Sequence, residues 1–389
     1  MYTYNTMKYY SNTTIDTILY KHIDIKFLFH YLYIITYIRT YRFKHRNYSK
    51  DQYVPLNIDI LRKIINYDNA HKFLKHLVEL KIIICNNEFS RVSHKSRGYR
   101  LNYKIVNEEF YLRKDTDKKL NIRIEKAYEK LKMGLIFDDE LGYGYVTQCM
   151  ENLIIDSKSA LNYIKDLIGE QKEFAKMSIE QFPTKFFKKD RTANRLHNNL
   201  TNLYTPLRNF LSYKGSKLVQ CDVRNSQLIF LYLLMRDCHI PDCEMDKFKN
   251  IVCEYGFYEF FSEKLNIELT EDSRKSFKQD IFENLLFGTN KSNLSQAESV
   301  FKTEFPSIFY IIRSIKTDNY KNLAIQLQKK ESEFIFNCVR KVNKKVPVFT
   351  IHDSLSTTIG NEDLIFKVMA DEFMNNFGIS PKIKIEKFA

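Results

Sequence analysis

The chain has 389 residues, of which 44% are hydrophobic and 14% are aromatic. This length allows two or three domains, and this composition excludes a disordered chain. The formal net charge is +14 at pH 7, which favours attraction to nucleic-acid backbones; a lysine-biased genome would give the same surplus. The seven cysteines suggest no disulfide framework, which fits a reducing cytoplasm.

Residues 1–48 are rich in tyrosine and isoleucine and form an N-terminal extension to which we assign no role. An apolar run at 25–35 is interrupted by Lys26 and His30. It is also shorter than the roughly 20 residues that a membrane-spanning helix needs. We therefore predict a core or interfacial helix here, no secretory signal and no membrane partner.

Residues 49–105 have the pattern of a small DNA-binding domain. A helix is predicted over 58–65, and Asp68 and Asn69 can cap a second helix over 70–80. Apolar runs follow that read as strands, with a basic loop between the last two. Two helices and a β-wing are the outline of a winged helix-turn-helix, in which the second helix enters the major groove.

In that architecture the second helix and the basic wing would contact DNA. The residues in these positions are Lys72, Lys75, His76, Lys95, Arg97 and Arg100. The alternative is a winged helix that binds protein or serves only as a scaffold. Residues 106–190 are charged and helical in period, which predicts a thumb-like segment that holds primer-template duplex, or a helical linker.

Two acidic residues each end or interrupt a short β-branched run of the kind that forms a buried strand. They are Asp222 and Asp353. A buried carboxylate costs several kcal/mol unless it is paired or binds a cation. Two such acids on neighbouring strands can hold the two divalent ions of a phosphoryl- or nucleotidyl-transfer site. We therefore predict that both bind Mg²⁺, with Mn²⁺ as the alternative ion; either Asp alone is more often a turn cap.

A basic helix is predicted between these acids, over 272–288, and its last residue is a glycine. Four residues recur at intervals of four and so share one face: Arg274, Lys278, Phe282 and Leu286. Two cations followed by apolar residues suit a triphosphate at one end and a base at the other. The alternative is a solvated basic face.

The order of acid, basic helix and His-Asp resembles the motifs of family A nucleic-acid polymerases. That family includes bacterial DNA polymerase I-like enzymes and single-subunit phage RNA polymerases. The segment at Asp222 resembles the first palm motif, 274–288 the fingers helix, and 351–354 the second palm motif. Segments 195–208 and 326–332 resemble the basic and the Gln-bearing stretches that precede the two palm motifs.

The resemblance covers residues 191–389, about half of the chain, and it implies roles for individual residues. It implies that Asp222 and Asp353 hold the metal ions and that Lys278 both clamps the triphosphate and donates a proton to pyrophosphate. His352 lies next to Asp353 and would brace the backbone or touch the primer terminus; the alternative is a histidine whose polar groups are satisfied in the core. The resemblance implies that the nucleotide is contacted by Arg274, Phe287, Gln227 and Val223. It implies that DNA is contacted by Arg195, Arg208 and Gln328.

The fingers helix departs from the family pattern at its end. In the family, the aromatic residue before the final glycine lies eight residues after the lysine, but here Leu286 holds that position and Phe287 follows. At about 100° per residue, Phe287 would face away from Lys278. Either a one-residue π-bulge restores Phe287 to that face, or Leu286 packs on the base.

A second departure lies at Gln227, five residues after Asp222. DNA polymerases of the family usually carry Glu there, as a steric gate against the ribose 2′-hydroxyl, and RNA polymerases carry a small residue. Gln has a bulk similar to that of Glu, which favours the DNA enzyme. The His-Asp-Ser sequence of the second palm motif is the RNA-polymerase form, so the sugar preference stays open.

We therefore predict an α+β protein in which a winged-helix domain precedes a right-hand polymerase. Its palm would carry an antiparallel sheet, with helical fingers and a thumb-like segment. The predicted domains are 1–48, 49–105, 106–190 and 191–389. The predicted activity is that of a DNA-directed DNA polymerase using two metal ions, with primer-template, duplex DNA and nucleoside triphosphates as partners. The alternatives are a single-subunit RNA polymerase and a non-enzymatic DNA-binding replication initiator or regulator.

Overall fold

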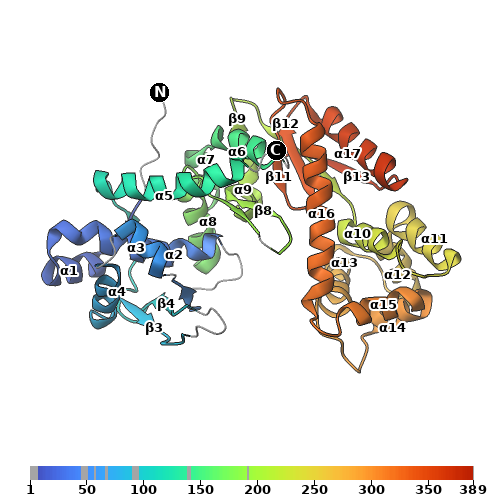
Figure 1. The fold of residues 1–389 in the computed structure, drawn as a ribbon, viewed down its shortest axis with the longest axis horizontal. Helices are drawn as coiled ribbons and strands as arrows, with labels where there is room; N and C mark the ends of the chain where they lie inside the picture. The colour runs from blue at the N-terminus through green and yellow to red at the C-terminus, as the bar shows by residue number, and fades with distance from the viewer. Residues whose placement is uncertain are drawn as a thin grey trace. The chain divides into compact units, whose positions relative to one another are not determined.

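The computed structural model describes residues 8–44, 51–56, 58–65, 69–89, 96–137, 142–190 and 192–388. These residues fall into two compact units (Figure 1). The first unit comprises the described residues within Met1–Phe137, Ile154–Phe187 and Asn198–Phe210, and the second those within Asp138–Leu153, Lys188–His197 and Leu211–Ala389. The predicted four-part division of the chain stays a prediction. Among the described residues, no helix has the length and apolar character needed to cross a membrane.

The first unit is built mainly from helices. Its α-helices are α1 (Thr13–His22), α2 (Leu28–Lys44), α3 (Ile58–Ile65), α4 (Asn69–Glu79), α5 (Lys118–Phe137), α7 (Ser157–Tyr163), α8 (Gly169–Gln181) and α9 (Asn199–Asn202). Its 3₁₀ turns are η1 (Ile25–Phe27) and η3 (Thr205–Phe210), and its strands are β1 (Tyr10–Ser11), β2 (Val54–Pro55), β3 (Ile83–Cys85), β4 (Gly98–Leu101) and β5 (Tyr111–Leu112). Three short strands link the two units along the chain: β6 (Leu153–Ile155), β7 (Phe187–Lys189) and β8 (Leu196–Asn198).

Helix α2 lies in the core of the first unit. Leu32, Ile34 and Ile35 are each 0% exposed although they point in different directions around the helix. A helix that is apolar on every side is stable only when other elements surround it. The predicted core helix is therefore confirmed from Leu28 onward.

The segment predicted to be a winged helix contains two helices and an antiparallel sheet. Helices α3 and α4 pack together, and strand β4 pairs with both β2 and β3, giving the order β2-β4-β3. The strand predicted over 89–92 lies largely outside the described residues. The order of elements agrees with the predicted pattern, while the assignment as a winged helix stays a prediction.

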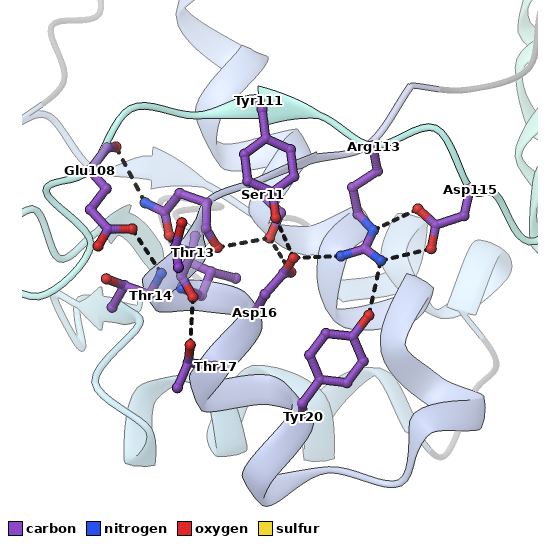
Figure 2. Close-up of polar contacts among 12 residues, drawn as sticks. Ser11, Thr13, Thr14, Asp16, Thr17, Tyr20, Glu108, Tyr111, Arg113 and Asp115 are labelled. Carbon is purple, nitrogen blue, oxygen red and sulfur yellow. Dashed lines mark hydrogen bonds and ion pairs between the residues drawn. The ribbon is translucent and has the colours of Figure 1, made fainter.

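A polar network joins the start of α1 to strand β5 (Figure 2). The carboxylate of Asp16 accepts hydrogen bonds from the hydroxyls of Ser11 and Tyr111 and pairs with Arg113 at 2.7 Å. Arg113 also pairs with Asp115 and donates to the Tyr20 hydroxyl. The side chains of Asp16 and Arg113 are only 16% and 9% exposed, so water cannot replace these contacts cheaply.

We expect Asp16→Asn to destabilise the first unit by about 1–3 kcal/mol, because Arg113 and two hydroxyls would lose a shared acceptor. The matched control is Glu79→Gln. Glu79 is 56% exposed in its ion pair with Lys75, and such exposed pairs contribute about 0–1 kcal/mol. Thermal unfolding followed by circular dichroism compares the variants. Equal midpoints for the two would show that the network carries little stability.

The second unit combines a four-stranded antiparallel sheet with helices. Its strands are β9 (Leu211–Tyr213), β10 (Leu218–Val223), β11 (Phe349–Ile351), β12 (Ser354–Thr358) and β13 (Ile383–Lys387). Its α-helices are α6 (Tyr143–Glu151), α10 (Ser226–Met235), α11 (Asp242–Asn250), α12 (Phe257–Leu265), α13 (Glu271–Asp280), α14 (Gln296–Glu304), α15 (Pro306–Ile315), α16 (Lys321–Lys341) and α17 (Glu362–Phe377). Two π-helical segments are η4 (Ile251–Tyr255) and η5 (Ile281–Leu286).

The sheet has the strand order β11-β12-β10-β13. Helix α17 packs against three of its strands, and α16 packs against α10 and α17 (Figure 1). In α10, every residue but Leu234 is buried, so this helix lies at the centre of the unit. Because only two residues separate β10 from α10, the end of this strand lies next to the buried core of the unit.

Candidate active site

Strand pairing brings the two predicted carboxylates together. Asp222 lies near the end of β10, directly opposite Ser354 on the antiparallel neighbour β12. Such opposed residues have Cα atoms about 4.5–5.5 Å apart. Asp353 immediately precedes Ser354, in the two-residue turn that joins β11 to β12. The two acids therefore occupy adjoining positions at one end of the sheet.

His352 is the first residue of this turn. Its backbone φ is 51°, in the left-handed region that tight hairpin turns require and that residues other than glycine and asparagine adopt at a cost. Its ring lies 6.2 Å from that of His197, at an angle of 70°. The strained backbone at His352 thus sets the direction in which the chain enters Asp353.

The electrostatics of Asp222 reflect its surroundings. Burial, followed by the charges of Asp353 and Glu386, raises the pKa of Asp222 to about 7, while a hydrogen bond from Gln220 and the charge of Lys278 oppose the shift. The carboxylates of Asp222 and Asp353 therefore repel one another, and the cation of Lys278 acts on the same position. A site of this kind gains from a bound cation, which would relieve the repulsion.

Asp353 is held from the other side by the start of α10. The hydroxyl of Ser226, the first residue of α10, donates to the Asp353 carboxylate. The preceding residue, Asn225, has a φ of 56°, which lets the chain leave β10 and enter the helix within two residues. The positive end of the α10 dipole also favours a negative charge here.

A third acidic residue, Glu331 of α16, interacts with Asp353 through its charge. It is 1% exposed, and its carboxylate accepts hydrogen bonds from the guanidinium of Arg195 and the side-chain amide of Gln227. Burial raises the pKa of Glu331 to about 7, Arg195 opposes the shift, and the charge of Asp353 adds to it. Glu331 therefore contacts Gln227 directly and interacts with Asp353 through its charge.

This network gives a physical reason for glutamine at position 227. A glutamate there would bring a second carboxylate against Glu331, and like charges at such a buried contact are costly. The amide avoids this cost because its nitrogen donates to Glu331. Gln227 is 8% exposed, and its Oε1 atom accepts no hydrogen bond from the described residues.

The predicted basic helix comprises α13 and η5, and the two cations predicted to bind phosphate, Arg274 and Lys278, have different environments. Lys278 is exposed and lies over the ring of Phe282, with its Nζ atom 5.6 Å from the ring centroid. Arg274 pairs with Glu259 of α12 at 2.7 Å and lies over the ring of Tyr258. Arg274 would therefore have to exchange Glu259 for any phosphate that it binds.

The end of this helix is a π-helix, the first of the two alternatives that the spacing raised. Over η5 the amide of Phe287 donates to the carbonyl of Phe282, five residues back. The π turn absorbs one residue, so Phe287 takes the angular position of the eighth residue in a regular helix. Phe287 contacts Phe282 edge to face at 5.3 Å, whereas Leu286 is 0% exposed in the core.

The structure also locates the residues predicted to touch DNA or the nucleotide. In the second unit, Val223 is 2% exposed and Gln328 is half-buried on α16. In the first unit, Arg208 lies in η3, and Lys72 and Lys75 are exposed on α4. Their roles stay predictions.

The proposed wing and second helix carry the remaining residues that were predicted to contact DNA. Arg97 is exposed, whereas Arg100 lies 3.9 Å from Asp51 and over the ring of Tyr53. His76 is partly engaged, because its Nδ1 atom lies 2.8 Å from the Tyr31 hydroxyl. Lys95 lies outside the described residues.

Sequence reasoning missed Glu331, Ser226, Glu259 and a buried lysine, Lys316. Glu331 had a detectable signal, because it lies between Leu327 and Phe334 on the apolar face of a helical period, where a charge needs a partner. The others had none, since each acts through a contact that is distant in the sequence.

Comparisons with known proteins give similarities to solved structures but none to curated sequences. No protein-family model and no curated protein matches the chain. Among solved structures, the chain is similar to the polymerase domain of Pol1 from M. smegmatis, which was solved in complex with a DNA primer-template and a dNTP. The TM-score is 0.42 at 11% identity, and the match covers 60% of this chain and 55% of that one. The functional conclusion therefore depends on the residues of the site.

Proposed function

We propose that this protein transfers nucleotides onto a DNA primer under the direction of a template, as a DNA polymerase. The observation that carries the proposal is the register of β10 and β12, which puts Asp222 opposite the residue after Asp353. The charge of Lys278 acts on Asp222. Paired carboxylates beside a cation are the groups that nucleotidyl transfer from a triphosphate requires.

The donor set fits magnesium. Mg²⁺ is commonly bound by one or two carboxylates together with substrate phosphates and water, and Asp222 and Asp353 supply two carboxylates. The described residues contain no group of three or more His, Cys, Asp or Glu side chains that could hold a metal ion, so substrate oxygens would complete the coordination. When bound, the metal would neutralise phosphate charge and lower the pKa of the attacking hydroxyl.

The protein's own residues would orient the nucleotide. Lys278 is exposed on the face that Phe282 and Phe287 share, so it would bind the triphosphate while the aromatic rings pack on the base. Lys278 would also give a proton to the departing pyrophosphate. Arg274 would exchange Glu259 for phosphate, and because both side chains are over a third exposed, that exchange costs little.

The direct test is primer extension by the purified chain, with dNTPs or rNTPs and with Mg²⁺ or EDTA. We expect template-dependent extension that requires the divalent ion and prefers dNTPs. Extension with rNTPs alone would support the RNA polymerase alternative. Absence of extension with either substrate, on a protein that binds DNA, would support the non-enzymatic alternative.

We further propose that the α3–α4 segment binds duplex DNA. Lys72 and Lys75 are exposed on α4, the helix that would enter the major groove. Replacing both with alanine should weaken duplex binding and flatten the plot of log K against log salt by up to about 0.9 per lost phosphate contact. The control is Lys21→Ala with Lys26→Ala, two exposed lysines elsewhere in the first unit. Equal slopes for the two double variants would support the alternative, in which the segment is only a scaffold.

A further inference from the structure

The π turn η5, at the end of α13, is held by two residues. Gly288 follows the turn, and a Cβ atom at this position would lie 2.0 Å from the carbonyl oxygen of Glu283. No other residue fits there without moving the backbone. The turn therefore depends on a glycine on one side, and on the other side it is held by the lysine that follows α15.

Lys316 follows the last residue of α15 and is 4% exposed. Its Nζ atom donates to the carbonyl oxygen of Leu285 at 2.7 Å and lies 3.3 Å from that of Asn284. The last carbonyls of a helix have no partner within it. A buried ammonium without acceptors would cost several kcal/mol, so each group supplies what the other needs.

This contact favours the π turn over a regular helix. In an uninterrupted α-helix, the amide of Gly288 would donate to the carbonyl of Asn284, four residues back. That amide would compete with Lys316 for the same oxygen and leave the ammonium with fewer acceptors. By occupying this end of the helix, Lys316 stabilises the arrangement in which Phe287 bonds five residues back to Phe282.

We propose that Lys316 is a positioning residue for nucleotide binding, which acts by holding the π turn that aligns Lys278, Phe282 and Phe287. This inference rests on the proposed function of the fingers helix. The cation of Lys278 contacts the Phe282 ring, and Phe282 contacts Phe287, so the alignment is a continuous row of side chains. Without the π turn, Phe287 would rotate out of the row.

The test uses the full chain with Lys316→Met, which keeps an unbranched side chain and removes the donors. Loss of one stacking contact on the base should raise the KM for the incoming dNTP about tenfold or more, with a smaller change in kcat. Deleting Glu283, an exposed residue of the turn, removes the extra residue and gives Phe287 the same angular position in a regular helix. Lys316→Met combined with this deletion should therefore recover most of the KM.

The control is Lys321→Met, an exposed lysine at the start of α16, which should leave KM unchanged. A raised KM that the deletion does not restore would overturn the proposal, since Lys316 would then act only on the stability of the fold. An unchanged KM in Lys316→Met would overturn it as well.

A second measurement separates this proposal from the proposed function. The chain has no tryptophan, so Phe287→Trp provides a single fluorescent probe in the row. Adding Lys316→Met should shift its emission maximum, and deleting Glu283 should shift it back. If the protein never extends a primer, the proposed function fails while this measurement still tests the π turn; an emission maximum that does not respond to Lys316→Met refutes the role of Lys316.

Discussion

Asp222→Asn and Asp353→Asn are each expected to reduce nucleotide incorporation by about 10³-fold or more. Charge stabilisation by a bound metal is worth several kcal/mol, and each ~1.36 kcal/mol is a factor of ten in rate. Asparagine keeps the size of the side chain, so the sheet and the Ser226 contact should be largely preserved. Single-turnover primer extension in saturating Mg²⁺ and dNTP measures the effect.

The matched control is Asp318→Asn, at an exposed acid in the second unit, which should extend primers at the normal rate. The far-ultraviolet circular dichroism spectra of all three variants should match that of the natural protein. Extension by Asp222→Asn or Asp353→Asn at a near-normal rate would remove the carboxylate pair from the mechanism.

Asp222→Asn should also change the pH dependence of the free energy of unfolding in the absence of metal. The pKa of Asp222 is about 7 in the folded protein and its ordinary value is 3.8, so between these values the folded state holds a proton that the unfolded chain has released. The free energy of unfolding therefore falls as the pH rises from about 4 to 7. At pH 8, Asp222→Asn should be more stable than the natural protein by on the order of 1–3 kcal/mol, once solvent screening of this partly exposed group is allowed for.

Urea unfolding in EDTA at pH 4, 6 and 8 tests this expectation. The stability difference between Asp222→Asn and the natural protein should grow from pH 4 to pH 8, and added Mg²⁺ should reduce it by stabilising only the natural protein. A difference that is independent of pH would mean that folding does not raise the pKa of Asp222.

Gln227→Gly is expected to raise the use of rNTPs relative to dNTPs, by about tenfold or more if one steric clash of ~1.4 kcal/mol is removed. The reason is that Gln227 is fixed by Glu331, which prevents its side chain from moving aside for a ribose 2′-hydroxyl. Discrimination is a difference between two transition-state energies, so removing a clash helps only the substrate that suffered it. The ratio of kcat/KM for rNTPs and dNTPs is the measurement.

The dNTP value of the same variant is the internal control, because general damage would lower both values. Glu331→Gln is a second variant that keeps the bulk at position 227 but weakens its anchor, and it should change the ratio less than Gln227→Gly. A natural protein that already prefers rNTPs would replace the DNA polymerase proposal with the RNA polymerase alternative. An unchanged ratio in Gln227→Gly would show that Gln227 is not the gate.

The sequence by itself determined the features that depend on local pattern. The β-branched runs around Asp222 and Asp353 predicted strands, the apolar stretch before Thr36 predicted a core helix, and the four-residue spacing after Arg274 predicted a basic helix. Each pattern reflects a backbone period that neighbouring residues repeat. The nine-residue spacing from Lys278 to Phe287 even suggested a π-bulge, although packing of Leu286 on the base was an equal alternative.

Only the tertiary structure decided which charges are buried and what satisfies them. Glu331 meets Arg195 and Gln227 across 136 and 104 positions of the chain, and Lys316 meets Leu285 across 31. A local window contains one partner of each pair and therefore cannot show whether the charge is solvated or held. The free energy of a buried charge depends on groups that folding brings from elsewhere, so the supports of the site emerge only when strands and helices have packed.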